Sequence, residues 1–456
     1  MNHVVIAPDK FKGTLTAGQV AAHVAAGLER ACPGLQSVQA PVADGGEGTV
    51  DAAAAAGYRR IEVGVRGPTG RPVTAAFALR DRTAIIEAAQ ACGLSRLPGE
   101  VLAPRTASSH GVGELMLAAA RMGAERIVLG LGGVASTDGG AGMVAALGAR
   151  LVDESGAPLP PGGAALARLH RIDVSTPRGL PATEIVVATD VDNPLLGEHG
   201  AAAVYGPQKG ASANDVASLE AGLARWADVA EQALGKTSRD EPGAGAAGGL
   251  GFAALAFLGA TARPGIDLML DLLAFRARLT GARLVITGEG AIDAQTLRGK
   301  APAGVARAVS AAAGQAGAVP VLAVAGRCSL STAQLRAAGI VRAYALADIE
   351  PDIGTCHSRA GPLLEELSWV VARDWINPER LTTAAGLTRP RPGSWIQRCR
   401  APAPSRGHRD LRGDQRHDRR DQPVRPPAQR FRPRMPLLPS RPGPRPDREA
   451  GRAGRG

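Results

Sequence analysis

The sequence has few aromatic residues, few lysines and no paired cysteines, and each shortage excludes a class of protein. Aromatics make up 3% of its 456 residues, so an aliphatic core is expected. The five cysteines are scattered and form no Cys-x-x-Cys pair, which argues against a cysteine metal site and fits a reducing compartment. No stretch approaches the roughly 18 apolar residues of a membrane span, and the first residues lack a signal-peptide pattern. We therefore expect a cytoplasmic protein without a membrane partner.

A net positive charge is also missing from most of the chain, although the net charge of the whole is +11. Residues 373–456 contain 21 Arg, no Lys and 8 acidic residues, whereas residues 1–372 contain 32 basic and 34 acidic residues. The last segment is rich in Arg and Pro and shows no apolar periodicity, so we predict that 373–456 is a disordered tail. Two interpretations stay open, a basic segment that binds nucleic acid and the product of a frameshift in a GC-rich gene. We favour the second and do not expect a nucleic-acid partner.

Strand and helix patterns alternate through the remaining residues, which predicts the α/β class. A β-α-β pattern opens the chain at residues 4–43, and a similar one spans 284–325. We therefore predict two α/β domains. One is a Rossmann-like or flavodoxin-like domain with a parallel sheet, formed discontinuously by 1–62 plus 280–372. The other comprises residues 63–279 and is inserted into the first.

Four glycine-rich segments stand out, three of which contain acidic and hydroxyl residues, and we interpret all four as loops. Glycine lets backbone N–H groups approach an anion closely, and a neighbouring Asp can hold a metal or accept a proton. Together they indicate a phosphate site that uses Mg²⁺. The alternative is that the glycines close tight strand–helix connections and the Asp residues cap turns. The segments are 43–49, 130–140, 243–249 and 287–293.

Lysine occurs five times in a chain that otherwise uses Arg. Lys10, Lys12, Lys209 and Lys300 lie in or beside loop motifs. A lysine is a compact point charge, so its retention there indicates a contact to an anion, although surface decoration stays possible.

Several of these segments, in order along residues 4–372, resemble the bacterial glycerate kinase family of the glycerate 2-kinase type. The resemblance is carried by blocks at 6–16, 42–49, 132–140, 190–195, 205–211, 242–249, 286–296 and 299–306. The chain departs from the family pattern at Val134, Thr137 and Ala291, where the family usually has Ser, Asn and Arg. The tail has no counterpart in the family.

The resemblance implies ATP-dependent phosphorylation of D-glycerate, with 2-phosphoglycerate favoured over 3-phosphoglycerate, in organic acid catabolism that feeds glycolysis. It implies ATP and Mg²⁺ as cofactors and a two-domain α/β fold. A different small-molecule kinase of the galactokinase–homoserine kinase type stays open, because residues 130–136 weakly resemble the loop of that group. A nucleic-acid-binding protein acting through the basic tail is the other alternative.

We assign candidate roles on the basis of these motifs. Asp190 ends a predicted buried strand, and we expect it to accept the proton of the substrate hydroxyl. The other catalytic candidates are Lys12 and Asp44. The metal candidates are Asp138 and Asp293. The candidates for binding the nucleotide are Gly45, Gly46, Gly132, Gly133, Lys209, Gly288, Glu289, Gly290 and Lys300.

Overall fold

The structure is a computed structural model that describes residues 3–174, 180, 182–312 and 319–376. Residues 373–375, which we predicted to begin a disordered tail, form the last turn of a helix, α14 (Ala360–Trp375). That helix continues because Val371 and Ala372 on its inner face are buried in the core. The rest of the predicted tail, from 377 onward, lies outside the described residues.

A parallel five-stranded sheet combines strands from both ends of the described chain. Its strands are β1 (His3–Pro8), β2 (Ser37–Gln39), β11 (Ala282–Ile292), β12 (Val321–Cys328) and β13 (Arg342–Ala345). They lie in the order β13-β12-β11-β1-β2, with Val5 opposite both Val285 and Val38. The parallel sheet is the arrangement that the two β-α-β patterns predicted.

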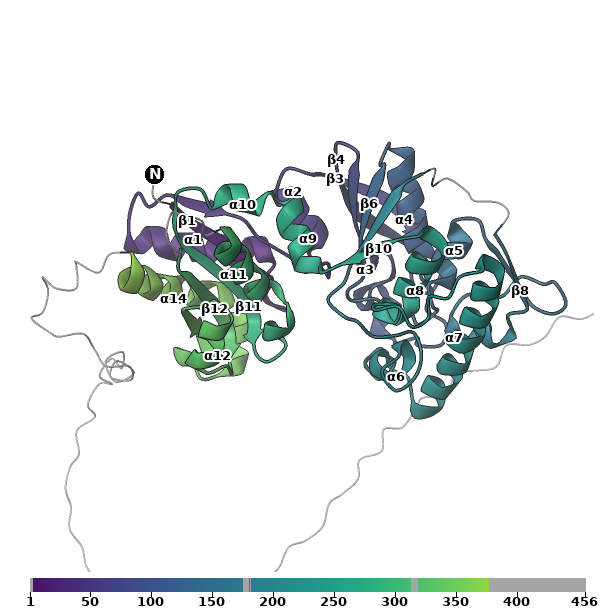
Figure 1. Cartoon of the computed structure of the whole chain (residues 1–456). Coiled ribbons are helices and arrows are strands. Elements are labelled where there is room, and N and C mark those ends of the chain that lie inside the picture. The colour runs from purple at the N-terminus through teal and green to yellow at the C-terminus, as the bar shows by residue number, and fades with distance from the viewer. Residues whose placement is uncertain (1–2, 175–179, 181, 313–318, 377–456) are drawn as a thin grey trace, which may run out of the picture. The chain divides into compact units, whose positions relative to one another are not determined.

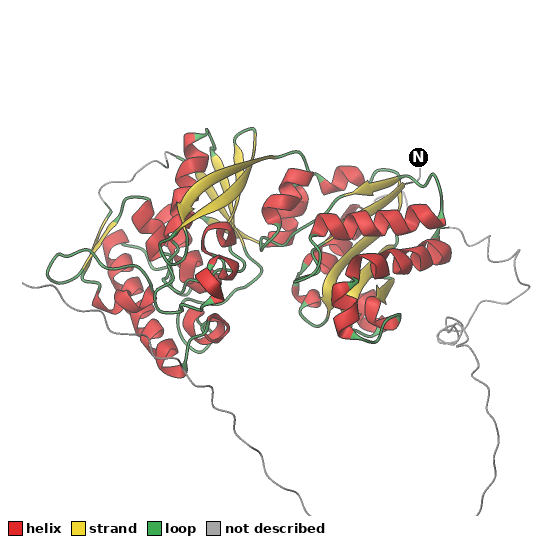
Figure 2. Ribbon diagram, turned by 180° about the vertical axis from the view of Figure 1, so that it is seen from behind, coloured by secondary structure: helices red, strands yellow, loops and turns green. Residues whose placement is uncertain are grey.

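Helices cover both faces of this sheet, as Figures 1 and 2 show. Alternate residues of β1 point to opposite faces, so Val4 and Ile6 pack against α1 (Ala17–Ala31) and α14. Val5 and Ala7 belong to a second core that includes α9 (Gly265–Leu272) and α11 (Ala301–Ala312). The remaining helices of this part are α10 (Phe275–Arg278), α12 (Thr332–Ala337) and α13 (Ile353–Ser358).

A six-stranded mixed sheet is formed by the middle of the chain. Its order is β10-β9-β6-β5-β4-β3, parallel from β10 to β5 and antiparallel from β5 to β3. The strands are β3 (Arg59–Arg66), β4 (Pro72–Arg80), β5 (Thr83–Glu87), β6 (Arg126–Gly130), β9 (Glu184–Ala188) and β10 (Thr261–Arg263). A separate two-stranded antiparallel sheet pairs β7 (Arg150–Val152) with β8 (Arg171–Asp173).

The two faces of the six-stranded sheet carry different helices. α2 (Thr49–Ala55) and α9 pack on one face, in the same core as one face of the five-stranded sheet. The other face packs against the remaining helices, among them α4, α5, α7 and α8 (Figure 1). These are α3 (Ala88–Cys92), α4 (His110–Arg121), α5 (Ala141–Ala146), α6 (Ala201–Tyr205), α7 (Ala213–Leu234) and α8 (Ala246–Leu258). Short 3₁₀ turns occupy Leu94–Arg96, Pro98–Glu100, Gly163–Arg168, Pro207–Lys209, Thr296–Arg298 and Leu346–Asp348.

The predicted α/β class is confirmed, and one predicted loop is wrong. Gly288, Glu289 and Gly290 do not form a loop but continue β11, because Gly288 pairs with both Pro8 and Val324 in the parallel ladder. The division into two domains, one inserted in the other, stays a prediction. Among the helices of the described residues, none is both long enough and apolar enough to cross a membrane.

Candidate functional site

The five-stranded sheet has a topological switch point between its neighbouring strands β1 and β11. The chain leaves β1 toward β2 on one side and leaves β11 toward β12 on the other. In open parallel sheets the crevice at such a point, beyond the carboxyl ends of the strands, is the usual place for a ligand. Asp9 directly follows β1 and Glu289 lies near the end of β11. The topology therefore places two carboxylates at the position where a ligand is expected.

Asp9 is a buried carboxylate with little compensation for its charge. It is 8% exposed, and its Oδ1 accepts the backbone N–H of Lys10 at 2.7 Å. Desolvation raises the pKa of Asp9 to about 7, with Asp44 and Glu289 adding to the rise and Lys10 opposing it. Asp9 can therefore exchange a proton near neutral pH.

Glu289 is the second buried carboxylate of the switch point. Thr296 donates its hydroxyl to Glu289 Oε1, and Lys300 Nζ lies 3.9 Å from Oε2. Desolvation raises the pKa of Glu289, against the lowering effects of Thr296 and Lys300. The carboxylate of Asp293, which accepts the N–H of Gln295 at 2.8 Å, contributes to the rise. Glu289, Asp293 and Lys300 therefore form one group.

Asp44 lies in a loop that the carboxyl ends of both sheets approach. A Cβ on Gly130, at the end of β6, would lie 2.1 Å from the carbonyl oxygen of Gly45. A Cβ on Gly265, at the start of α9, would lie 1.9 Å from the carbonyl oxygen of Asp44. Both positions require glycine because backbone meets backbone there. Gly132 packs in the same way against Gly46, so the alternative of tight structural turns explains much of this glycine pattern.

Glu87 anchors the Asp44 loop from the end of β5. It is 1% exposed, and its Oε2 accepts the N–H groups of Gly48 at 3.0 Å and Val50 at 3.4 Å. Desolvation raises the pKa of Glu87 to about 7, although those two bonds lower it. The loop and the N-terminus of α2 are thereby fixed to the six-stranded sheet.

Asp190 follows β9 and reaches the same loop. Its Oδ1 accepts the N–H of Gly265 at 2.8 Å. Desolvation by the surrounding loops raises the pKa of Asp190 to about 7, and the negative charges of Asp44 and Asp267 add to the rise. The residue as a whole is exposed, so water screens part of this effect. We call Asp9, Asp44, Asp190 and Glu289 the strand-end carboxylates.

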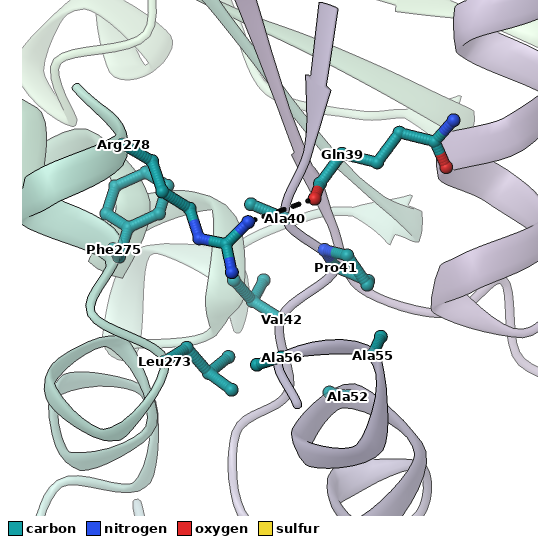
Figure 3. Close-up of a pocket in the computed structure, with 10 residues that line it drawn as sticks. All are labelled: Gln39, Ala40, Pro41, Val42, Ala52, Ala55, Ala56, Leu273, Phe275 and Arg278. Carbon is teal, nitrogen blue, oxygen red and sulfur yellow. Dashed lines mark hydrogen bonds between the residues drawn. The ribbon is translucent and has the colours of Figure 1, made fainter. Parts of the chain in front are cut away.

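Two hollows adjoin α2, and they differ greatly in size. The pocket of Figure 3 lies between α2 and the segment around Phe275, where Arg278 donates to the carbonyl oxygen of Gln39. Its volume of about 10 Å³ holds at most one water molecule. The second, which we call the α1–α2 pocket, has a volume of about 410 Å³. It is lined by residues 10–11 and 13–19, by Pro41, Glu47 and Gly48, by Asp51, Ala52 and Ala55 of α2, and by Gln90. The second alone has the size of a ligand site.

Lys209 lies in a different environment from the strand-end carboxylates. It is 3% exposed, and its Nζ donates to the carbonyl oxygen of Ser136 at 2.6 Å and to Thr137 Oγ1 at 3.4 Å. Desolvation lowers the pKa of Lys209 to about 8, partly offset by Cys92 and Asp138. A Cβ on Gly248 would lie 2.9 Å from Nζ, so the ammonium also touches the start of α8.

Asp138 is saturated with hydrogen bonds. Its carboxylate accepts the N–H and hydroxyl of Ser109 and the N–H groups of Gly140 and Gly142, all within 3.2 Å. This bonding joins the starts of α4 and α5, as the turn-capping alternative expects. We call Lys209, Asp138 and their partners in residues 109 and 136–142 the Lys209 network.

The structure brings together some predicted site residues and separates others. Asp44, Asp190, Glu289, Asp293 and Lys300 belong to the strand ends, and the backbone of Lys12 lies beside Gly290. The Lys12 side chain is exposed. Lys209 and Asp138 form the separate network. Within the described ranges, no three His, Cys, Asp or Glu side chains are grouped as metal ligands.

Our sequence reasoning missed Asp9 and Glu87. Each stands at the end of a buried strand, Val4–Pro8 or Ala84–Glu87, which is the same signal that singled out Asp190. Applied to every strand, that signal would have found them both.

Known proteins resemble most of the chain. The sequence profile of the glycerate kinase family matches residues 4–376. The glycerate kinase of Bacillus subtilis strain 168 is 48% identical over 330 residues, covering 72% of this chain and 85% of that protein. The glycerate 2-kinase of Escherichia coli K12 is 46% identical over 309 residues, covering 66% and 81%. The crystal structure of a Salmonella typhimurium LT2 protein assigned as glycerate kinase 2 superposes with a TM-score of 0.70. It is 40% identical and covers 83% of this chain and 99% of that one.

Proposed function

We propose that this chain, which belongs to the glycerate kinase family, transfers the γ-phosphoryl group of ATP to D-glycerate. The observation that carries the proposal is the gathering of the strand-end carboxylates beside the α1–α2 pocket, at the switch point of the parallel sheet. We favour transfer to the 2-hydroxyl, because one relative is named a glycerate 2-kinase. The product is then 2-phosphoglycerate.

Asp190 is the proposed acceptor of the hydroxyl proton. The substrate oxygen attacks the γ-phosphorus, the bond to the β–γ bridging oxygen breaks, ADP leaves, and the proton passes to the carboxylate. Asp190 suits this role because the residue is exposed and its Oδ1 is held by Gly265, which leaves Oδ2 for the proton. Asp9 has a similarly raised pKa but is buried.

Positive charge for the phosphates and the substrate carboxylate comes from lysines at the strand ends. Lys12 has an exposed side chain, and Lys300 stands near Glu289. An ammonium group stabilises the charge that spreads over the transferred phosphoryl oxygens. Asp44, between the two sheets, is proposed to orient the reacting groups.

Mg²⁺ is the expected companion of the nucleotide, and its two predicted ligands fit unequally. Asp138 does not fit, since four donors already engage its carboxylate. Asp293 fits better, because it lies with Glu289 at the strand ends. Magnesium is commonly held by one or two carboxylates together with water and phosphate oxygens, and it would neutralise phosphate charge there.

A direct assay tests this function. The purified chain is incubated with ATP, Mg²⁺ and D-glycerate, ADP release is followed with a coupled assay, and phosphorus NMR identifies the product isomer. We expect 2-phosphoglycerate, with L-homoserine and D-galactose giving no turnover above background. The same chain ending at residue 376 should be equally active. Absence of phosphoryl transfer to D-glycerate by the folded protein would overturn the proposal.

A further inference from the structure

The α1–α2 pocket adjoins the strand-end carboxylates. Lys10, which lines it, directly follows Asp9, and Glu47 and Gly48 line it a few residues beyond Asp44. Lys10 Nζ donates to the carbonyl oxygen of Glu47, so the two loops meet at this edge of the pocket. A ligand whose reacting end lies at the carboxylates can therefore extend into the pocket.

The volume of the pocket indicates which of the two substrates, ATP or D-glycerate, occupies it. Glycerate is a three-carbon acid, whereas the pocket is an open cleft of about 410 Å³, within the range of about 300–1,000 Å³ typical of sites for larger molecules. Glycerate alone would leave most of that space empty. A nucleoside is the part of the reactants that has a matching size.

The lining also suits a flat, polar ring system. Its lining combines the larger apolar side chains of Phe11 and Leu15 with small residues of the two helices, Gly18 of α1 and Ala52 and Ala55 of α2. A Cβ built on Gly18 meets no atom within 4 Å, so the wall is open there. Such walls can contact both faces of a base.

Polar groups for a base edge and a ribose are available at the border of this pocket. Gln90 Oε1 accepts from Arg96, and Gln19 Oε1 accepts from Thr16. Both amide NH₂ groups remain as donors without a partner among the described residues. Asp51, which also lines the pocket, supplies acceptor oxygens, one of which pairs with Arg60 at 2.7 Å.

From these observations we propose that the α1–α2 pocket binds the nucleoside of the phosphoryl donor, with its phosphates directed to the strand-end carboxylates. The inference rests on the proposed function in one respect, that the donor is a nucleotide. It assigns the pocket to the nucleotide and not to glycerate.

Filling the pocket tests the inference. Gly18→Trp and Ala55→Trp each place an indole in it, and Ala22→Trp, on an exposed part of α1 that does not line the pocket, is the matched control. We expect both pocket variants to raise the Kd for ADP at least about 10-fold in calorimetric titrations. Tripolyphosphate affinity and the KM for D-glycerate should stay within about 2-fold of the unmodified protein. The control should match that protein in all measurements.

Two outcomes overturn the inference. One is unchanged ADP affinity in both folded pocket variants, and the other is a rise in the KM for D-glycerate with ADP binding intact. Hydrogen exchange of the unmodified protein gives an independent reading should a variant fail to fold. ADP, and not D-glycerate, should protect the amides of residues 10–19 and 47–55, and lack of protection also overturns the inference.

Failure of the proposed function would look different. If the protein binds ADP in the pocket but does not phosphorylate D-glycerate, the nucleoside site holds and the assignment of D-glycerate as substrate is wrong. If the protein phosphorylates D-glycerate and neither Trp substitution changes ADP binding, the proposed function holds and the nucleoside site is wrong.

Discussion

The strand-end carboxylates and the Lys209 network lie in glycine-rich surroundings that look alike in the sequence, yet their chemistry differs. Asp9 and Glu289 are buried with raised pKa values and stand at the strand ends beside a pocket. Lys209 and Asp138 are also buried, but Lys209 donates hydrogen bonds to a neighbouring loop and Asp138 accepts them from neighbouring loops. In the first region charge is poorly compensated, and in the second it fixes the loops.

This difference separates two uses of a buried charged side chain. A charge whose bonds are made within the protein stabilises a particular loop conformation, and its removal leaves partners unsatisfied. A carboxylate kept near others of its kind costs stability and is retained where it serves a ligand or a proton transfer. Substitutions in the two regions should therefore have opposite effects on stability and activity.

The largest expected effect is on turnover. Asp190→Asn keeps an oxygen that can accept the Gly265 N–H but cannot take a proton, so kcat should fall about 100-fold or more. Steady-state kinetics at saturating ATP and D-glycerate measures this. Asp267→Asn, which removes a neighbouring charge on α9, is the control and should change kcat by less than about 3-fold. Near-normal turnover in folded Asp190→Asn would remove Asp190 from its role.

The second effect is on stability, in the other region. Lys209→Met keeps the length of the side chain but leaves the Ser136 carbonyl without its donor, so the free energy of unfolding should fall by about 1–3 kcal/mol. Urea unfolding followed by circular dichroism measures the change. Lys236→Met, at an exposed lysine paired with Glu241, should change it by less than about 0.5 kcal/mol. A Lys209→Met protein of unchanged stability but weakened ATP binding would instead make Lys209 a ligand contact.

The sequence predicted the framework well because local patterns determine it. The β-α-β pattern at residues 4–43 predicted a helix there, and the structure has it as α1, with a capping box at Thr16 and with Val20, Val24 and Leu28 buried. The buried strand patterns predicted β1 and the start of β11. The pattern misled at Gly288–Gly290, because glycine commonly breaks strands but here makes room for Val324 of β12.

The site was only partly predictable, because the chemical state of a residue depends on partners distant in the sequence. Asp138 and Asp190 each follow a strand and a short loop, yet Ser109 and two backbone N–H groups nearby engage the first while Gly265 contacts the second. Lys209 and Lys300 each stand in a glycine-containing loop, and only the fold buries the first. The roles of these residues stay predictions.

The third expected effect is a gain of stability in the variant Asp9→Asn, and its size should depend on pH. The pKa of Asp9 is raised to about 7 in the folded protein from 3.8 for an aspartate in water, so the folded state binds more protons than the unfolded state between these two pH values. The wild-type protein should therefore lose stability as the pH rises from about 4 to 7. Asp9→Asn removes this loss.

Unfolding measured at two pH values tests the direction of this change in stability. Asp9→Asn should be more stable than the wild type by about 1–2 kcal/mol at pH 8 and show a smaller difference at pH 4.5. Asp153→Asn is the contrasting control, because hydrogen bonds lower the pKa of that exposed carboxylate and its loss should not stabilise the protein at pH 8. A stability gain that is the same at both pH values would remove titration of Asp9 as its cause.

The smallest stability effect is expected for the lysine at the strand ends. Lys300→Met removes an ammonium that is partly exposed and 3.9 Å from Glu289, so the free energy of unfolding should change by less than about 1 kcal/mol. The KM for ATP should nevertheless rise about 3-fold to 10-fold and should depend less on salt concentration, because a contact to phosphate is lost. The same Lys→Met change at position 209 should have the reverse pattern. If Lys300→Met destabilised the protein as strongly as Lys209→Met and left the KM unchanged, the two regions would not differ in the way their contacts indicate.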